Sequence, residues 1–506
     1  MQSKFTKIGV VGSGAMGRGI AQLAAQSGCE VWLYDSHPPA CAEARASILA
    51  VWAALVEKGR LQSSDAQLAG ARLNVAPSIQ HLAQCQLVIE AITEDLGLKQ
   101  SLMADLERLL AEDAVLATNT SSLSVTAIGS VLKRPARFAG LHFFNPVPLM
   151  KVVEVVPGAR TTKAVCEDLT KWVKALGHTP VCAQDTPGFI VNHAGRGYGT
   201  EALRVLGESV SDVATIDRIL KDQLGFKLGP FELLDLTGLD VSHPVMESIY
   251  HQYFEEPRYR PSVITAQRLA GGLLGRKSGE GFYVYGPAGA AVAPEPPAPS
   301  VAAMPPVWVS PKAARRAELY QYLKDAGATI ETGAAPSSQA LILVAPLGMD
   351  VTTLAAVERL DPTRTLGIDM MLPDAAVKRR VLATNPATRA DMRDAAHALF
   401  ARDGKAVSVI RDSGGFVSQR VAATIVNIAA DMCQQGVCTP GDLDIAVSLG
   451  LGYPLGPLAL GDSIGPTNVL EILFNLQTVY GDPRYRPSPW LRRRGALGLS
   501  LKHEEI

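Results

Sequence analysis

The sequence predicts an α/β nucleotide-binding domain and an all-helical domain, followed by a shortened, degenerate α/β segment and a second all-helical domain. Three observations support this fold class. A glycine-rich turn between a strand and a helix opens the chain. Alternating strands and helices continue to about residue 185, which is typical of a doubly wound parallel sheet. Motifs of the first half then recur in the second half at a near-constant offset of 227 residues.

The chain has 506 residues, which is enough for several domains at roughly 100–200 residues per domain. Residues 287–305 are rich in Pro and Ala and carry few charges, so they are predicted to form a semi-extended linker. The predicted domains are a nucleotide-binding domain at 1–186, a helical domain at 187–286, an α/β remnant at 306–412 and a second helical domain at 413–506.

Composition and charge exclude several classes of function. The chain is 47% hydrophobic with a formal net charge of −1, so neither nucleic acid nor a membrane is expected as a partner. Its seven scattered cysteines form no CxxC pair, which argues against a metal site and indicates a reducing compartment. No apolar run approaches the roughly 18 residues that span a bilayer, and no signal peptide is recognisable. We therefore expect a cytoplasmic protein.

The opening turn has the spacing of a dinucleotide-binding fingerprint. Residues 7–11 form a predicted strand, Gly12 permits a tight turn, Gly14 lets a pyrophosphate approach the backbone, and Gly17 lets helix and strand pack closely. Asp35 follows about 20 residues later, at the end of the next strand, where a carboxylate binds ribose hydroxyls and repels a 2′-phosphate. NAD is therefore favoured over NADP, while FAD is compatible with the fingerprint alone. The predicted cofactor contacts of this turn are Gly12, Gly14, Ala15, Met16 and Gly17.

Two later strands carry a histidine and a glutamate. His142 lies in the predicted strand 138–144, and Glu154 lies between two valine pairs, where a core residue is expected. A buried carboxylate is costly unless it is paired, and His142 is the nearest partner in sequence. Such a pair can act as a general acid/base on a secondary alcohol. The alternative interpretation is a core histidine, with Glu154 bonded to a backbone amide.

Polar residues also follow two other predicted strands. Glu94 comes just after the strand at 86–92, and Lys99 lies on the helix that follows. The strand at 115–117 ends in the polar cluster 119–122. The carboxyl ends of parallel strands are where a cofactor binds, so these groups are candidates for the site. The alternatives are an exposed acid and a solvated lysine.

Five motifs together resemble the L-3-hydroxyacyl-CoA dehydrogenase family. They are GSGAMGRGIA at 12–21, EAITEDLGLK at 90–99, NTSSL at 119–123, GLHFFNPVPLMKVVEVV at 140–156 and DTPGFIVN at 185–192. The resemblance extends from residue 8 to about 285. It implies a Rossmann domain followed by a helical domain that forms dimers, and hence a homodimer or a higher homo-oligomer.

The resemblance also implies residue roles. His142 is implied as the general base with Glu154 as its partner, Ser121 as a ligand of the substrate's 3-oxygen and Asn192 as a further polar group of the site. From the residues alone, Ser121 could equally be a helix cap or turn hydroxyl and Asn192 a helix-start amide. The implied cofactor contacts beyond the glycine turn are Asp35 at the adenosine ribose, and Glu94, Lys99, Asn119 and Asn145 near the nicotinamide.

The implied reaction is reversible, NAD-dependent oxidation of a (3S)-3-hydroxyacyl-CoA to the 3-oxoacyl-CoA. The chain's length and degenerate second half resemble bacterial dehydrogenases of phenylacetate degradation that act on 3-hydroxyadipyl-CoA, with short-chain substrates such as 3-hydroxybutyryl-CoA as an alternative. Arg196, Arg258 and Arg260 are candidates to bind a terminal carboxylate, although structural ion pairs are favoured for each. Two other classes stay open: a dehydrogenase of a free hydroxy acid or sugar acid, and a non-catalytic NAD-binding protein.

The second half, termed the second copy below, retains structural motifs of the first copy and lacks its site residues. Retained residues include Asp185 and Arg137, which recur as Asp412 and Arg364. The replacements at the same offset are Ser121 by Gly348, His142 by Asp369, Asn145 by Leu372, Glu154 by Val381 and Asn192 by Gln419. We hypothesise that the second helical domain packs on the first as a dimer partner would, within one chain. The alternative is an additional dimerisation module.

Overall fold

The computed structural model describes residues 4–287 and 289–505. Their contacts divide the chain into two compact units. Unit 1 comprises the chain up to residue 193 together with 435–451, and unit 2 comprises 194–434 together with 452 onwards. Each unit is described by itself below.

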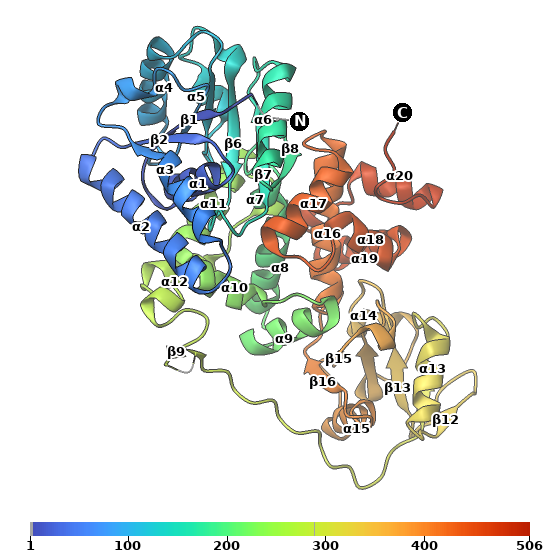
Figure 1. The fold of residues 1–506 in the computed structure, drawn as a ribbon. Helices are drawn as coiled ribbons and strands as arrows, with labels where there is room; N and C mark the ends of the chain where they lie inside the picture. Colours follow the sequence, from blue (N-terminus) through green and yellow to red (C-terminus); the bar gives the residue numbers. More distant parts are fainter. Residues whose placement is uncertain (1–3, 288, 506) are drawn as a thin grey trace. The chain divides into compact units, whose positions relative to one another are not determined.

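Unit 1 is built on an eight-stranded sheet in the order β3-β2-β1-β4-β5-β6-β7-β8 (Figure 1). The pairings are parallel except that between β6 and β7. The order reverses between β1 and β4, and the crevice at such a point is where open α/β sheets bind ligands. The strands are β1 (Lys7–Val11), β2 (Glu30–Tyr34), β3 (Leu73–Val75), β4 (Leu87–Glu90), β5 (Val115–Thr118), β6 (Phe138–Phe143), β7 (Val152–Pro157) and β8 (Thr179–Cys182).

Helices flank this sheet, as the alternating pattern predicts. A break near residue 59 separates two of these helices: α2 ends at Glu57, Gly59 has a φ of +65° and α3 begins at Ser63. The helices of unit 1 are α1 (Ala15–Gln26), α2 (Pro38–Glu57), α3 (Ser63–Arg72), α4 (Leu96–Leu109), α5 (Val125–Gly129), α6 (Lys163–Ala175), α7 (Val191–Ala194) and α17 (Pro440–Leu451).

Helix α2 differs from the expectation that no segment is long and apolar enough to span a bilayer. Among the described helices it alone passes that test by length and composition, with a mean hydropathy of 1.4, so the expectation is wrong by this measure. One such helix is weak evidence for a membrane. Its buried residues belong to the core of unit 1, and they are Cys41, Ala44, Ile48 and Trp52.

Unit 2 contains the helices of both copies and confirms the predicted all-helical regions. Almost every residue of α16 is buried, so this helix forms the centre of the helical part. The helices are α8 (Arg196–Gly207), α9 (Val213–Leu224), α10 (Pro230–Thr237), α11 (Leu239–Gln252), α12 (Val263–Ala270), α16 (Ser418–Gln434), α18 (Pro457–Ile464), α19 (Pro466–Tyr480) and α20 (Pro489–Leu497).

Unit 2 also contains a second sheet, in the order β12-β11-β13-β14-β15-β16. Its last four strands repeat β5 to β8, at an offset of 226 residues for β13 and 227 for the other three, including the antiparallel step: Gly367 pairs with Ala383 as Gly140 pairs with Val156. The second sheet has six strands where the first has eight, with β11 and β12 on the far side of β13. The elements are β11 (Val307–Val309), α13 (Arg316–Asp325), β12 (Ile330–Glu331), β13 (Leu341–Val344), α14 (Val351–Val357), β14 (Thr365–Ile368), β15 (Arg379–Ala383), α15 (Ala390–Phe400) and β16 (Ala406–Ile410).

The segment between the two copies begins with a small hairpin, β9 (Tyr285–Gly286) and β10 (Gly289–Ala290), and then has no regular structure up to β11 (Figure 1). It is nevertheless anchored. Glu295 accepts two hydrogen bonds from Arg379, at 2.8 and 2.6 Å, and this ion pair lowers the pKa of Glu295. The linker is therefore tethered to β15 of the second sheet at Glu295.

The helical parts of the two copies pack in a pseudo-twofold manner. Arg260 lies 3.8 Å from Asp482, and its counterpart Arg486 lies 3.1 Å from Glu256, the counterpart of Asp482. Such reciprocal pairs characterise an isologous interface. The two helical domains therefore pack on each other within one chain; their likeness to a dimer partner stays a hypothesis.

Arginines at this interface have structural partners. Arg258 is 1% exposed, forms an ion pair with Asp431 at 2.7 Å and donates to the carbonyl of Arg486. The structural interpretation of Arg258 is thus confirmed. Near it, Arg420 is fully buried and bonds Glu201 and Glu208 at 2.9 and 2.6 Å.

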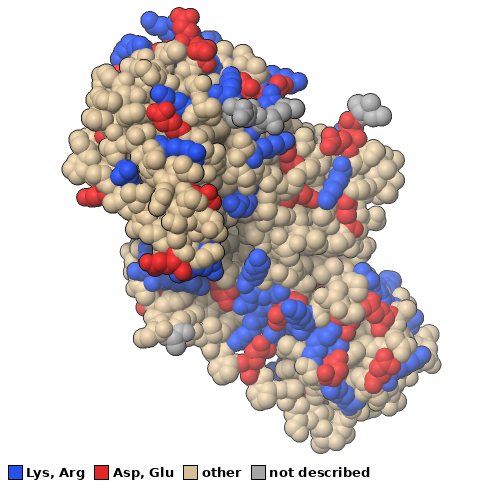
Figure 2. Space-filling model, in the orientation of Figure 1, with Lys and Arg blue, Asp and Glu red and all other residues tan. Residues whose placement is uncertain are grey.

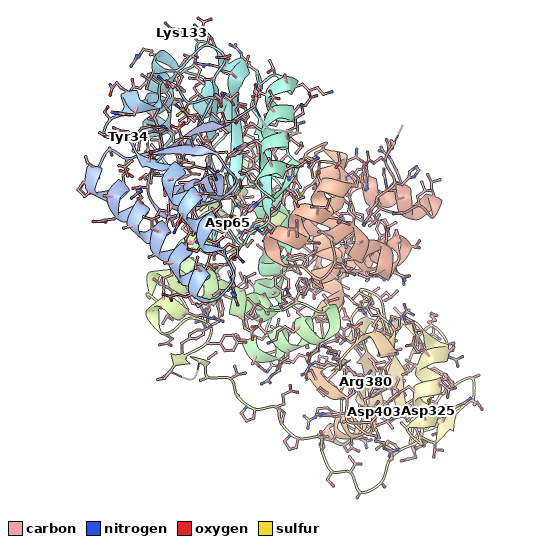
Figure 3. All side chains as sticks on the ribbon, viewed as in Figure 1. Tyr34, Asp65, Lys133, Asp325, Arg380 and Asp403 are labelled. Atoms are coloured by element: carbon pink, nitrogen blue, oxygen red, sulfur yellow. The ribbon has the colours of Figure 1, made fainter. Side chains whose placement is uncertain are left out.

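Charged side chains of both signs are interspersed on the visible face (Figure 2), as a net charge of −1 predicts. Some of these groups form local networks. In the second sheet Arg380 and Asp403 lie beside each other (Figure 3), with Nη2 and Oδ2 2.7 Å apart. No disulfide joins cysteines of the described residues.

Candidate active site

The central feature of unit 1 is a histidine–glutamate pair formed across two strands. His142 of β6 and Glu154 of β7 are direct register partners in the one antiparallel step of the sheet. Their Nδ1 and Oε2 atoms are 2.5 Å apart, and the side chains are 5% and 0% exposed. Because Nδ1 faces the carboxylate, the imidazole has only Nε2 left for a substrate. The predicted pairing is confirmed by this geometry.

The second oxygen of Glu154 is also fully used. Its Oε1 accepts the backbone N–H groups of Ile190 and Val191, each at 2.9 Å. These donors belong to the turn that begins α7. A buried carboxylate with this many donors is held in one orientation, and through it so is the ring of His142.

A cavity of about 300 Å³ brings the predicted residues together. It lies within unit 1 and is open to a ligand at His142. Eight of its lining residues are those that the sequence predicts for the site: Met16, Glu94, Lys99, Asn119, Ser121, His142, Asn145 and Asn192. The remaining lining residues are apolar: Ala91, Ile92, Phe143 and Phe144.

Glu94 and Lys99 form an ion pair that lines this cavity. Lys99 is 1% exposed, so the alternative of a solvated lysine is wrong, and its Nζ lies 3.1 Å from Glu94 Oε2. Burial by itself would raise the pKa of Glu94, but the Thr120 hydroxyl and the Lys99 ammonium lower it to about 2. The same carboxylate accepts the backbone N–H groups of Ser121 and Ser122, at 2.9 and 3.1 Å. Glu94 therefore fixes the loop that carries Ser121.

Sequence reasoning missed the second partner of Lys99, which stabilises this ion pair. Glu90, fully buried at the end of β4, receives Lys99 Nζ at 2.5 Å and the Thr118 hydroxyl at 2.6 Å. The signal was present: Glu90 follows three apolar residues of a strand, in the same kind of position that identified Glu154. Asn119 is fixed in a related way, because its Oδ1 accepts the N–H of Phe143 at 2.8 Å.

The glycine turn fits a dinucleotide. Gly12 has a φ of +102°, and a Cβ on Gly17 would lie 1.8 Å from the carbonyl oxygen of Gly12, so neither position accepts a side chain. A Cβ on Gly14 would meet nothing within 4 Å, which leaves open space at the start of α1. No side chain caps this helix and no acid lies in its first turn, so its N–H groups are available to a phosphate.

Asp35 completes the fit to a cofactor with free ribose hydroxyls. Its Oδ2 accepts the N–H and hydroxyl of Ser13, at 2.8 and 2.7 Å, and its Oδ1 accepts the N–H of His37. Burial would raise the pKa of Asp35, but these hydrogen bonds lower it. The carboxylate is thus ionised and fixed at the end of β2, beside the glycine turn.

The corresponding position in the second copy is closed by side chains. Gln419 donates to Asp369 Oδ1 at 2.9 Å and accepts the N–H of Gly348 at 2.8 Å. Gln419 and Asp369, which replace Asn192 and His142, thus bond to each other. The predicted replacement of Ser121 by Gly348 is wrong by one residue, because β13 aligns with β5 at an offset of 226 residues, which makes Leu347 the counterpart of Ser121. Asp369 Oδ2 is buried and has no hydrogen-bond partner among the described residues.

Comparison with known proteins agrees with this geometry. The model of the 3-hydroxyacyl-CoA dehydrogenase NAD-binding domain matches residues 7–186, and that of the C-terminal domain matches 188–285 and 415–504. The chain is 37% identical to a 3-hydroxyadipyl-CoA dehydrogenase of Escherichia coli over 98% of this chain and 99% of that protein. It is 39% identical to a probable 3-hydroxybutyryl-CoA dehydrogenase of Deinococcus radiodurans, over 55% of this chain and all of that one.

A solved structure also covers both copies. The 3-hydroxybutyryl-CoA dehydrogenase of Escherichia coli superposes with a TM-score of 0.85 at 35% identity, over 98% of this chain and 99% of that one. The fingerprint turn, the buried histidine–glutamate pair and these matches lead to one conclusion. The chain belongs to the 3-hydroxyacyl-CoA dehydrogenase family of NAD-dependent oxidoreductases.

Proposed function

We propose that this chain reversibly oxidises a (3S)-3-hydroxyacyl-CoA to the 3-oxoacyl-CoA, with His142 as the general base. The observation that carries the proposal is the 2.5 Å contact between His142 Nδ1 and Glu154 Oε2 at the wall of the cavity. It presents a neutral Nε2 as proton acceptor, and Glu154 stabilises the imidazolium that forms. Bound NAD would accept the hydride that leaves C3.

The other polar groups of the cavity have proposed roles around the same carbon atom. The Ser121 hydroxyl donates to the 3-oxygen and stabilises the charge that develops there. Asn192 orients the substrate from the start of α7. Met16, Asn119, Asn145 and the Glu94–Lys99 pair position the nicotinamide, while Asp35 binds the adenosine ribose. In the reverse direction His142 returns the proton to the oxygen.

For the acyl group we propose 3-hydroxyadipyl-CoA in phenylacetate degradation, with a short-chain substrate such as 3-hydroxybutyryl-CoA as the second candidate. The first is supported by the Escherichia coli relative named for that substrate, whose match includes the second copy. The second is supported by the superposing structure, which is that of a 3-hydroxybutyryl-CoA dehydrogenase. A terminal carboxylate needs a cation, and of the arginines considered Arg258 is already paired with Asp431.

A kinetic comparison tests these proposals. We would measure kcat/KM for NADH-dependent reduction of 3-oxoadipyl-CoA, acetoacetyl-CoA and free acetoacetate. A preference for 3-oxoadipyl-CoA of about tenfold or more supports binding of the distal carboxylate. Equal use of both thioesters favours the short-chain assignment, and turnover of free acetoacetate alone would refute use of CoA thioesters.

We also propose that the protein is cytoplasmic and forms a homodimer or a higher homo-oligomer. The scattered cysteines support the first assignment, and the family resemblance supports the second. Sedimentation of the purified protein measures the second. A strictly monomeric enzyme would instead mean that the packing of the two copies within one chain replaces dimerisation.

A further inference from the structure

A helix of the second copy lies against the turn that holds the catalytic pair. Helix α17 is grouped with unit 1, although the sequence places it in the second helical domain. It packs on β7 and β8 (Figure 1). Two hydrogen bonds anchor this segment beside β8: the N–H of Gln184 donates to the carbonyl of Val437 at 2.8 Å, and Asp442 Oδ2 accepts the N–H of Cys182 at 3.4 Å.

Gly450, near the end of α17, contacts the catalytic turn directly. A Cβ at this position would lie 2.9 and 3.0 Å from the two methyl groups of Val191, and 3.4 Å from Val152. Val191 is 1% exposed and its β-branched side chain is stiff, so it cannot rotate away. A side chain at residue 450 must therefore shift either α17 or the segment that carries Val191, whose N–H donates to Glu154 Oε1.

The equivalent contact is also made by a helix of the first copy, α9, against the second sheet. At the 227-residue offset, Gln223 of α9 corresponds to Gly450, and it bonds Ser418, the counterpart of Val191. It also donates to the carbonyl of Arg379, the counterpart of Val152. The contact is thus polar beside the second sheet and apolar, with a glycine, beside the catalytic strands. The close approach is specific to the side that carries His142 and Glu154.

We infer that the second copy positions the catalytic pair. Gly450 of α17 packs closely against Val191 and thereby holds the backbone N–H groups of Ile190 and Val191 on Glu154. This inference rests on the proposed roles of His142 and Glu154. The second copy then contributes to the reaction although it lacks a site of its own. Gly450 is a positioning residue, because its effect passes through Val191 and Glu154 to the imidazole.

The test compares Gly450→Ala with Gly441→Ala in the full chain. Both glycines lie on α17, but a Cβ on Gly441 would meet only Thr439 Oγ1, at 3.9 Å. We expect Gly450→Ala to lower kcat for acetoacetyl-CoA about ten- to a hundredfold, because small displacements of catalytic groups are costly, while KM for NADH stays within about twofold. Gly441→Ala should retain wild-type kcat. Equal kcat in Gly450→Ala and wild type would overturn the inference.

A second variant and a spectroscopic signal separate positioning from general loss of stability. In a Val191→Ala background the added methyl at residue 450 has room, so Gly450→Ala should then cost less than about twofold in kcat. A full cost in that background would show that the effect does not pass through Val191. The downfield NMR resonance of the His142 Nδ1 proton should move in Gly450→Ala and not in Gly441→Ala. That signal needs no substrate, so it decides the inference even if wild type fails to reduce acyl-CoA thioesters.

Discussion

Strand β7, which carries the proposed catalytic partner Glu154, has a counterpart in the second copy with the opposite character. In the first copy Glu154 follows two fully buried valines and bonds His142. In the second copy the corresponding residues of β15 are two arginines and Val381. Arg380 there bonds Asp374 and Asp403 and lies 4.0 Å from the ring centre of Tyr322. The same strand serves chemistry in one copy and ion pairing in the other.

The residues that both copies share explain the difference. Asp185 accepts the N–H groups of Val125 and Thr126, and Asp412 accepts those of Val351 and Thr352 in the same way. Arg137 and Arg364 each donate to two backbone carbonyls at equivalent positions. The shared residues therefore stabilise the backbone of both copies, whereas the residues that differ surround the cavity of the first copy.

The largest expected effect is that of Glu154→Gln. An amide whose oxygen keeps the bonds from Ile190 and Val191 must present its NH₂ group to His142 Nδ1. The imidazole then carries its proton on Nε2 and cannot accept another there. We expect kcat to fall on the order of 10³-fold, as in other wrong-tautomer substitutions, with NADH affinity unchanged. A folded variant with near wild-type kcat would contradict the assigned role of Glu154.

The next effect concerns stability at the interface between the copies. Arg420→Met leaves Glu201, which is fully buried, without its main ion-pair partner. We expect the free energy of unfolding in urea to fall by about 3–5 kcal/mol. The matched control is Arg486→Met, whose half-exposed pair with Glu256 should contribute about 0–1 kcal/mol. Similar losses for both variants would show that burial of the pair is not what matters.

A smaller effect depends on pH. Burial raises the pKa of Glu94, and the Thr120 hydroxyl and the Lys99 ammonium outweigh it, to about 2. The ionised form of Glu94 therefore contributes fully to stability above its ordinary pKa of 4.5. This contribution is lost only as pH falls through about 2. In Lys99→Met the cation is lost while the Thr120 hydroxyl and the backbone N–H donors remain, so the pKa of Glu94 rises.

The measurement is the Kd for NADH at pH 5 and pH 7. For Lys99→Met we expect binding at pH 5 to be weaker on the order of tenfold than at pH 7, beyond any change in wild type. Lys133→Met is the control, because Lys133 is an exposed lysine of the same unit (Figure 3). A pH dependence equal to that of wild type would contradict the claim that Lys99 lowers the pKa of a carboxylate on which NADH binding depends.

The smallest predicted effect belongs to the residue that replaces His142. Burial raises the pKa of Asp369 to about 6, so the native state holds a proton that the unfolded chain releases near 3.8. Its contribution to stability is fully present below 3.8 and is lost as pH rises through about 6. Asp369→Asn should therefore raise the free energy of unfolding at pH 8 by about 1 kcal/mol and change little at pH 4. Asp325→Asn, at an exposed site (Figure 3), should change neither, and an equal gain at both pH values for Asp369→Asn would contradict this assignment.

Much of the fold and the site could be predicted because they depend on local pattern. The glycine spacing, the valine pairs around Glu154 and the 227-residue offset are all readable from sequence. Those features predict the Rossmann domain, the helical domains and the His142–Glu154 pair, whereas Ser121, Asn145 and Asn192 were implied by the family resemblance.

The rest depends on contacts between residues far apart in sequence. No local signal indicates that Lys99 joins Glu90 to Glu94, that Gln419 fills the second site, or that α17 lies against Val191. The apolar composition of α2 likewise cannot be distinguished by pattern from that of a membrane-spanning helix. Such features follow from how the elements pack.

The central claim is that the first copy performs the reaction and the second copy supports the structure. One measurement tests it most directly: the rate of NADH consumption with acetoacetyl-CoA for wild type, His142→Gln and Asp369→Asn. We predict a loss of about 10²-fold or more for His142→Gln and a wild-type rate for Asp369→Asn, since only the former acts on protons at the cavity. An active His142→Gln enzyme, or an inactive, folded Asp369→Asn enzyme, would contradict it.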